Sequence, residues 1–103
     1  MIRHVVLFRF RDGVDWSDPR AVDAEAATAA HPAHIPEILA WEHGRNRNSR
    51  ATAYDFALIG TFADLSAVER YLAHPDHRDG VARWREIATW VVVDITVEEG
   101  VPA

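Results

Sequence analysis

The sequence predicts an α+β domain with the ferredoxin-like order β-α-β-β-α(α)-β and a four-stranded antiparallel sheet. Three observations predict this fold class. Residues 2–10 alternate with the period of a strand, the alanine-rich run 21–30 favours a helix, and residues 89–97 are rich in β-branched side chains. Strands and helices that follow one another in this way are typical of the split βαβ plan.

The first strand and the first helix have clear local signals. Asp12-Gly13 ends the strand of residues 2–10, and Ser17-Asp18-Pro19 supplies a helix cap with proline at the first helical position. The helix that begins there is expected to end near Pro32. On one face of the strand lie His4, Val6, Phe8 and Phe10.

Two further strands are expected in the middle of the chain. Pro36 marks a turn, and residues 38–43 then form the second strand, which ends in the polar loop 44–52. Residues 54–62 form the third strand. One of its faces carries Tyr54, Phe56, Leu58, Gly60 and Phe62.

A kinked helical region precedes the last strand. Asp64 and Ser66 can cap a helix, and Ser66 with Glu69 fits a capping box. Pro75 cannot continue this helix because it lacks an amide N–H, but it suits the first turn of a new one. Residues 75–88 are therefore expected to form a third helix behind a kink.

The predicted sheet has apolar residues on both faces. In the first strand Val5 and Leu7 lie behind Val6, and in the last strand Val91 and Val93 lie behind their apolar neighbours. Helices of one chain can cover only one face, so a second copy of the sheet is expected to bury the other as a homodimer. The alternative is an exposed, partly polar sheet face.

Composition limits the class of protein. The chain has 103 residues, which suits one domain, expected over residues 1–98 with a C-terminal tail at 99–103. Its 11 Lys and Arg against 16 Asp and Glu disfavour nucleic-acid binding, and it has no cysteine for disulfides or thiolate chemistry. We find neither a signal peptide nor an apolar run of about 18 residues, so no membrane contact and a cytoplasmic location are expected.

The densest set of proton-transfer groups lies in the seven residues from Tyr71 to His77. If His77 sits in the first turn of the third helix, the helix dipole favours its neutral imidazole, which can act as a general base. Tyr71 can donate a hydrogen bond to a developing oxyanion. The alternative is a purely structural helix corner, with His74 as the cap and Tyr71 in the core.

A pocket is expected between the sheet and the helices. His4 is an unusual polar ring on an apolar strand face, and Gly60 removes a side chain from the face of the third strand. A small apolar or aromatic ligand would fit there. The expected lining is Val6, Phe8, Leu58, Gly60, His74, Trp90 and Val92.

Other conspicuous residues receive structural interpretations. His31 and His34 flank Pro32 and are expected to be solvated. No metal site or cofactor is expected, because carboxylates and cysteines do not cluster beside the histidines at ligand spacing. The arginines of the long loop form either an anion site or a solvated hairpin loop: Arg45, Arg47 and Arg50. The tryptophans are expected in the core or at an interface: Trp16, Trp41, Trp84 and Trp90.

Six fragments, in order and at the right spacing, resemble the stress-responsive dimeric α/β-barrel (Dabb) family. They are Ile2-Arg3-His4-Val5-Val6-Leu7-Phe8-Arg9-Phe10, Ile35-Pro36, Gly44-Arg45-Asn46, Tyr54-Asp55-Phe56-Ala57-Leu58, Tyr71-Leu72-Ala73-His74-Pro75-Asp76-His77 and Val91-Val92-Val93-Asp94. The resemblance implies a ferredoxin-like monomer whose sheet packs against a second copy to form a barrel.

The resemblance also implies candidate functions. One branch of the family comprises cofactor-free polyketide cyclases with a histidine and a tyrosine in the pocket; the matching residues are His77 and Tyr71, with His4 as a further pocket histidine. The expected function is therefore a cyclase or lyase for an enolisable carbonyl compound, with His4 and His74 orienting groups or water. In that branch the first helix carries bulky aromatic residues, whereas residues 24–28 here are small or polar, so the substrate does not transfer. The alternatives are a non-enzymatic stress-responsive binding or structural module and a cofactor-free monooxygenase.

Overall fold

The structure, a computed structural model, describes residues 1–98, and the predicted tail at 99–103 lies outside the described residues. The elements follow the predicted order, which confirms the ferredoxin-like fold class. They are β1 (Ile2–Phe10), α1 (Pro19–His34), β2 (Ala40–Arg45), β3 (Phe56–Phe62), α2 (Leu65–Ala73), α3 (Pro75–Ile87) and β4 (Ala88–Thr96).

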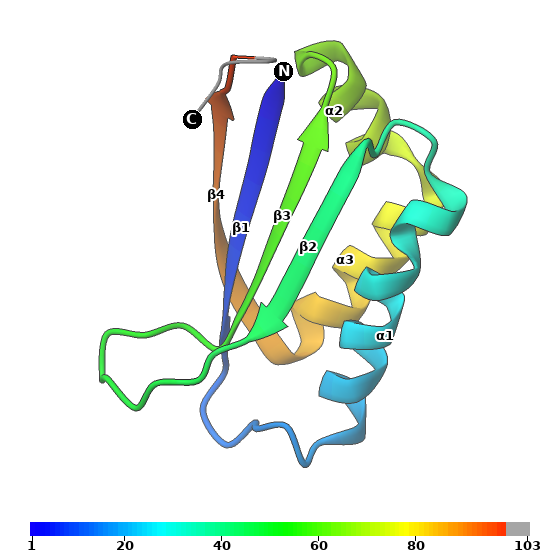
Figure 1. Cartoon of the computed structure of the whole chain (residues 1–103). Coiled ribbons are helices and arrows are strands. Elements are labelled where there is room, and N and C mark those ends of the chain that lie inside the picture. Colours follow the sequence, from blue (N-terminus) through cyan, green and yellow to red (C-terminus); the bar gives the residue numbers. More distant parts are fainter. Residues whose placement is uncertain (99–103) are drawn as a thin grey trace.

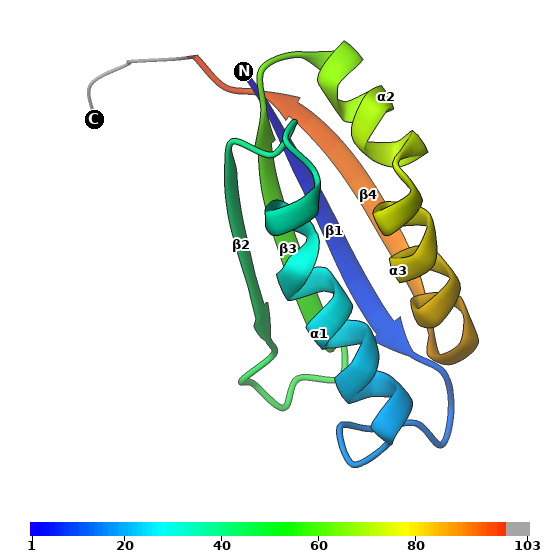
Figure 2. The same cartoon turned by 90° about the vertical axis from the view of Figure 1, so that its right-hand side faces the viewer.

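The four strands form one antiparallel sheet in the order β2-β3-β1-β4, and all three helices lie on one of its faces (Figures 1 and 2). The central strand β1 pairs with β3 on one side and with β4 on the other. In this register His4 lies opposite Gly60 of β3 and Asp94 of β4. The sheet order therefore brings a histidine from the start of the chain beside a carboxylate 90 residues later.

The core lies between the sheet and the helices. It contains a stack of aromatic rings in which Phe8 of β1 lies 4.2 Å from Trp84 of α3, centroid to centroid, and Phe56 of β3 lies 5.2 Å from the same indole. Stacked aromatic rings bury large apolar areas, so this cluster fixes α3 on the sheet. A second buried cluster surrounds Tyr71 and Phe62.

Strand β3 begins at Phe56 instead of residue 54, and two further predicted boundaries shift for local reasons. Helix α1 ends at His34 instead of near Pro32, because the amide of Ile35 still donates to the carbonyl of His31 over 2.9 Å and completes the last turn. Strand β2 begins at Ala40, later than predicted, because a turn follows α1, in which the amide of Ile38 donates to the carbonyl of Ile35.

The two helix caps of the kinked region are made by side chains. Asp64 alone caps α2, accepting from the amide of Ala67 over 2.8 Å, and Ser66 lies inside the helix, so the predicted capping box is wrong. His74 occupies the corner, where its Nδ1 accepts from the amide of Asp76 over 3.1 Å and thereby caps α3. Pro75 is the first residue of α3, as its missing amide requires.

The sheet face opposite the helices carries exposed apolar side chains. Leu7 of β1 and Val91, Val93 and Ile95 of β4 are 39 to 52% exposed. The predicted two-faced strands are therefore present, and the chain itself leaves one of these faces uncovered (Figure 1). No helix within residues 1–98 is long and apolar enough to cross a bilayer.

Candidate functional site

A cavity of about 180 Å³ lies between the sheet and the helices. Four of its polar rings are neighbours: Tyr71 lies 4.4 Å from His77, 5.5 Å from His4 and 6.5 Å from His31, centroid to centroid. The rest of its wall is mainly apolar and includes the aromatic rings of Phe8, Trp84 and Trp90. The cavity thus combines a cluster of proton-transfer groups with an apolar surface.

Tyr71 lies on the last turn of α2 and is almost fully buried. Burial, and secondarily the negative charge of Asp94, raises the pKa of its hydroxyl above the usual tyrosine range. The hydroxyl therefore stays protonated at every physiological pH. A buried, protonated phenol is suited to donating a hydrogen bond to an oxyanion.

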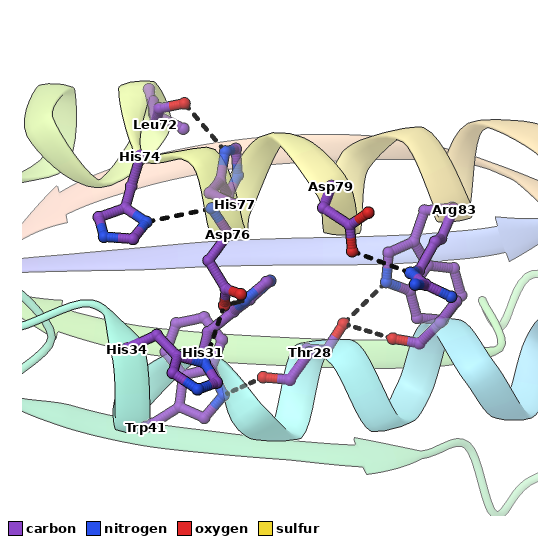
Figure 3. A network of polar contacts seen from close by, with 12 residues as sticks. Thr28, His31, His34, Trp41, Leu72, His74, Asp76, His77, Asp79 and Arg83 are labelled. Atoms are coloured by element: carbon purple, nitrogen blue, oxygen red, sulfur yellow. Dashed lines mark hydrogen bonds and ion pairs between the residues drawn. The ribbon is translucent and has the colours of Figure 1, made fainter.

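His77 lies in the first turn of α3, as the position of Pro75 predicted. Its Nδ1 lies 3.1 Å from the carbonyl oxygen of Leu72 (Figure 3). A carbonyl only accepts, so Nδ1 carries the proton and Nε2 keeps a free lone pair. Burial lowers the pKa of His77 to about 4, with smaller contributions from His31 and His4. The ring is neutral as expected, but the main cause is burial and not the helix dipole.

His4 is buried on the helix-facing side of β1, and its Nδ1 lies 2.6 Å from Oδ1 of Asp94. The two residues are cross-strand partners on β1 and β4. A carboxylate on Nδ1 fixes the ring orientation and leaves Nε2 as the nitrogen available to the cavity. Sequence reasoning did not find Asp94, although an acidic residue within the apolar run of the last strand was a usable signal.

His31 was predicted to be solvated, and this was wrong. Its side chain is 4% exposed, and its Nδ1 lies 2.7 Å from Oδ2 of Asp76 (Figure 3). The reason is the helical period: the buried face of α1 repeats through Ala21, Ala24 and Thr28 to His31. His34, one position past that face, is 57% exposed, as predicted.

The hydrogen bond from His31 also affects its partner. It lowers the pKa of the Asp76 carboxyl, whereas burial raises it. His34, 3.5 Å away, also lowers this pKa. Asp76 is therefore ionised at neutral pH. Helices α1 and α3 thus meet at one carboxylate.

Most of the predicted lining lies where expected, with two exceptions. The ring of Trp41 covers Gly60, and a Cβ atom at Gly60 would lie 2.8 Å from that ring, so this glycine makes room for Trp41 and not for the cavity. His74 caps α3 and is not part of the wall. The predicted residues that do line the cavity are His4, Val6, Phe8, Leu58, Tyr71, His77, Trp90 and Val92. The wall also contains residues that sequence reasoning missed: Thr28, His31, Leu72, Gly80, Val81, Trp84 and Asp94.

The charge of the wall limits the ligand. Within the described part of the chain, the lining includes the carboxylate of Asp94 and neither lysine nor arginine. No group of three His, Cys, Asp or Glu side chains among residues 1–98 is arranged to hold a metal ion. Since the described wall has no lysine or arginine to hold an anion, the arrangement is suited to acid and base chemistry on a neutral molecule.

The profile of the Stress responsive A/B Barrel Domain, Dabb, matches residues 2–97. The chain belongs to this family. A Dabb relative in sequence is an uncharacterised protein of Streptomyces coelicolor, which is 46% identical over 94 residues, covering 91% of this chain and 97% of that protein.

Solved structures share the Dabb fold. A dimeric ferredoxin-like protein of unknown function from Thermobifida fusca superposes with a TM-score of 0.81 at 30% identity, covering 93% of this chain and 90% of its own. Two enzymes are similar in fold alone. Hydroxynitrile lyase from Passiflora edulis has a TM-score of 0.79 at 18% identity, with 98% and 96% of the two chains covered. SnoaB, a cofactor-independent oxygenase from Streptomyces nogalater, has a TM-score of 0.73 at 21% identity, with 99% and 97% covered.

Proposed function

We propose that this Dabb protein is a cofactor-free cyclase or lyase that removes a carbon-bound proton from a small, neutral, enolisable carbonyl compound. The observation that carries the proposal is the pairing of His77 with Tyr71. A neutral imidazole and a protonated phenol lie 4.4 Å apart, centroid to centroid, on the wall of a largely apolar cavity. They are the base and the oxyanion donor that enolate formation requires.

Each group has a definite part in the proposed reaction. Nε2 of His77 takes the proton from the carbon next to the carbonyl, and the electron pair of the C–H bond moves to the carbonyl oxygen. The hydroxyl of Tyr71 donates a hydrogen bond to that oxygen. His4, held by Asp94 over 2.6 Å, lies 5.5 Å from the Tyr71 ring and presents its Nε2 to the same region.

The basicity of His77 narrows the substrate class. A pKa of about 4 keeps the ring unprotonated at neutral pH, but it also makes the ring a weak base. Such a base is effective only on an acidic carbon, such as the methylene between the two carbonyls of a 1,3-diketone. The aromatic wall formed by Phe8, Trp84 and Trp90 suits the apolar remainder of such a molecule.

The proposal includes a homodimer formed through the uncovered sheet face. Support comes from the exposed apolar side chains on that face, among them Val91 and Val93, and from the dimeric T. fusca relative at 30% identity. A second copy of the sheet would bury these side chains symmetrically.

Deuterium exchange tests the proposed proton transfer without knowledge of the natural substrate. The probe is 1-phenylbutane-1,3-dione, and NMR in D₂O follows exchange at the carbon between its carbonyls, with the buffer rate subtracted. We expect exchange by the wild type and a loss of about 100-fold in His77→Ala. Tyr71→Phe should lose about tenfold or more, whereas His34→Ala, an exposed histidine, should match the wild type.

Two other results would replace the proposal. Saturable binding of the diketone without exchange would make the protein a binding module. Consumption of oxygen with a quinol would support a cofactor-free monooxygenase, and the similarly folded SnoaB is a cofactor-independent oxygenase. In that case too the substrate would first lose a proton. The His77→Ala variant would therefore be inactive both in deuterium exchange and in oxygen consumption.

A further inference from the structure

We propose that His31, held by Asp76, is a second catalytic proton-transfer group in the cavity: it protonates the oxygen of a second carbonyl after the carbanion made by His77 has attacked it. This inference rests on the proposed function, because His77 must first generate the carbanion. It assigns a role to His31, which was expected to be solvated. It also specifies the reaction, since an enzyme that only forms an enolate needs no second acid.

The His31 ring forms part of the cavity wall. His31 is 3% exposed, lines the same cavity as Tyr71 and His77, and lies 6.1 Å from the His77 ring, centroid to centroid. It comes from α1, whereas His77 comes from α3, so the two imidazoles approach the cavity from different helices (Figure 3).

The hydrogen bond to Asp76 fixes the orientation of the His31 ring. Nδ1 of His31 is bound to Asp76 over 2.7 Å, which leaves Nε2 as the nitrogen that exchanges protons. Nε2 forms no hydrogen bond within residues 1–98. Every fully buried side-chain nitrogen or oxygen of these residues has a partner, so Nε2 itself is not fully buried. Nε2 therefore opens toward the cavity whose wall the ring forms.

A glycine of α3 makes the space for this ring. At Gly80 of α3, a Cβ atom would lie 2.8 Å from Nε2 and 2.9 Å from Cε1 of His31. Any other residue at this position would push the imidazole out of place. A helix interior disfavours glycine relative to alanine, and here that glycine is what admits the His31 ring beside α3.

The two histidines differ in the partner on Nδ1. His77 has a neutral carbonyl there, whose dipole supports an imidazolium less than a full negative charge would. His31 has an ionised carboxylate, whose negative charge stabilises a positive ring. His31 is thus suited to carry and deliver a proton where His77 is suited to accept one.

The proposed step balances on a defined probe, nonane-2,4,8-trione. His77 removes a proton from C3, between two carbonyls, and the resulting carbanion forms a bond to C8. The electrons of the C8 carbonyl move to its oxygen, which takes the Nε2 proton of protonated His31. The product, 2-acetyl-3-hydroxy-3-methylcyclohexanone, is an isomer of the probe, and the proton on His77 returns to His31 through water.

The experiment measures two rates on this probe in D₂O by NMR: exchange at C3 and formation of the cyclic product, each with the buffer rate subtracted. In His31→Asn we expect exchange within about twofold of the wild type and cyclisation slower by about 100-fold. Asp76→Asn should slow cyclisation by about tenfold with exchange retained. His34→Asn, the other histidine beside Asp76, should change neither rate.

The outcomes separate this inference from the proposed function. Wild-type protein that neither exchanges nor cyclises the probe would end both. Wild-type protein that does both, with His31→Asn cyclising at the wild-type rate, would overturn the role of His31 alone. Equal loss of exchange and cyclisation in His31→Asn would make the residue structural. If His31→Asn lacks a native circular dichroism spectrum, the exchange and cyclisation rates of Asp76→Asn decide whether His31 has the proposed role.

Discussion

Trp41 donates its indole N–H to the carbonyl oxygen of Thr28 over 3.1 Å (Figure 3). In an uninterrupted helix that oxygen would accept the amide N–H of residue 32, but residue 32 is a proline and has none. A side chain from β2 thus supplies the hydrogen bond that the backbone of α1 lacks. The contact fixes α1, and with it His31, against the edge of the sheet.

We predict that Trp41→Phe destabilises the protein by about 1–3 kcal/mol, because it leaves the carbonyl of the buried residue Thr28 without a donor. The same substitution in a Pro32→Ala background should cost less, since the alanine restores the amide N–H that this carbonyl would accept. Urea unfolding of the four proteins in this cycle measures the coupling. Equal costs in both backgrounds would contradict the account.

The strands and the Tyr71 to His77 corner were predictable because their signals are local. Alternation fixes the faces of β1 within nine residues, and Pro75 marks the start of α3 within one turn. His77 and Tyr71 are therefore brought together by a short helix corner that the sequence itself encodes.

The carboxylate partners could not be predicted in the same way. Asp94 meets His4 only through the register of β1 with β4, and Asp76 meets His31 only because α1 packs beside α3. Neither pairing has a signal in any short stretch of sequence. The burial of the His31 side chain, by contrast, was predictable from the sequence, because His31 continues the helical period of the buried residues of α1.

Gly80→Ala should destabilise the protein by about 1–3 kcal/mol, although alanine is ordinarily the better helix residue by about 1 kcal/mol. The new Cβ would meet Nε2 of His31 at 2.8 Å, and the bond to Asp76 prevents that ring from moving away freely. In a His31→Ala background the clash is absent. There the same substitution should stabilise the protein, and a destabilisation of equal size would show that the clash is not the cause.

Val93→Asp should convert the proposed homodimer into monomers. Val93 is 52% exposed on the uncovered sheet face, and a dimer interface would bury an unpaired carboxylate there. We expect the dimer dissociation constant to rise on the order of 100-fold or more, because a buried unpaired charge costs several kcal/mol. Size-exclusion chromatography with light scattering measures it. Val22→Asp, on the exposed side of α1, is the matched control and should remain dimeric; loss of the dimer in both variants would count against the sheet face as the interface.

His77 should make the protein less stable as the pH falls from 6.5 toward 4. Burial lowers its folded-state pKa from the ordinary 6.5 to about 4, so between these values the unfolded chain binds the proton and the folded protein does not. Stability therefore rises with pH across this window, and below about pH 4 both states are protonated and the contribution of His77 is constant. Because the ring is partly solvated, we expect only about 1–2 kcal/mol from it. Subtracting the unfolding free energy of His77→Gln at each pH isolates this ring from the carboxylates, and a flat difference curve between pH 6.5 and 4 would refute the shift.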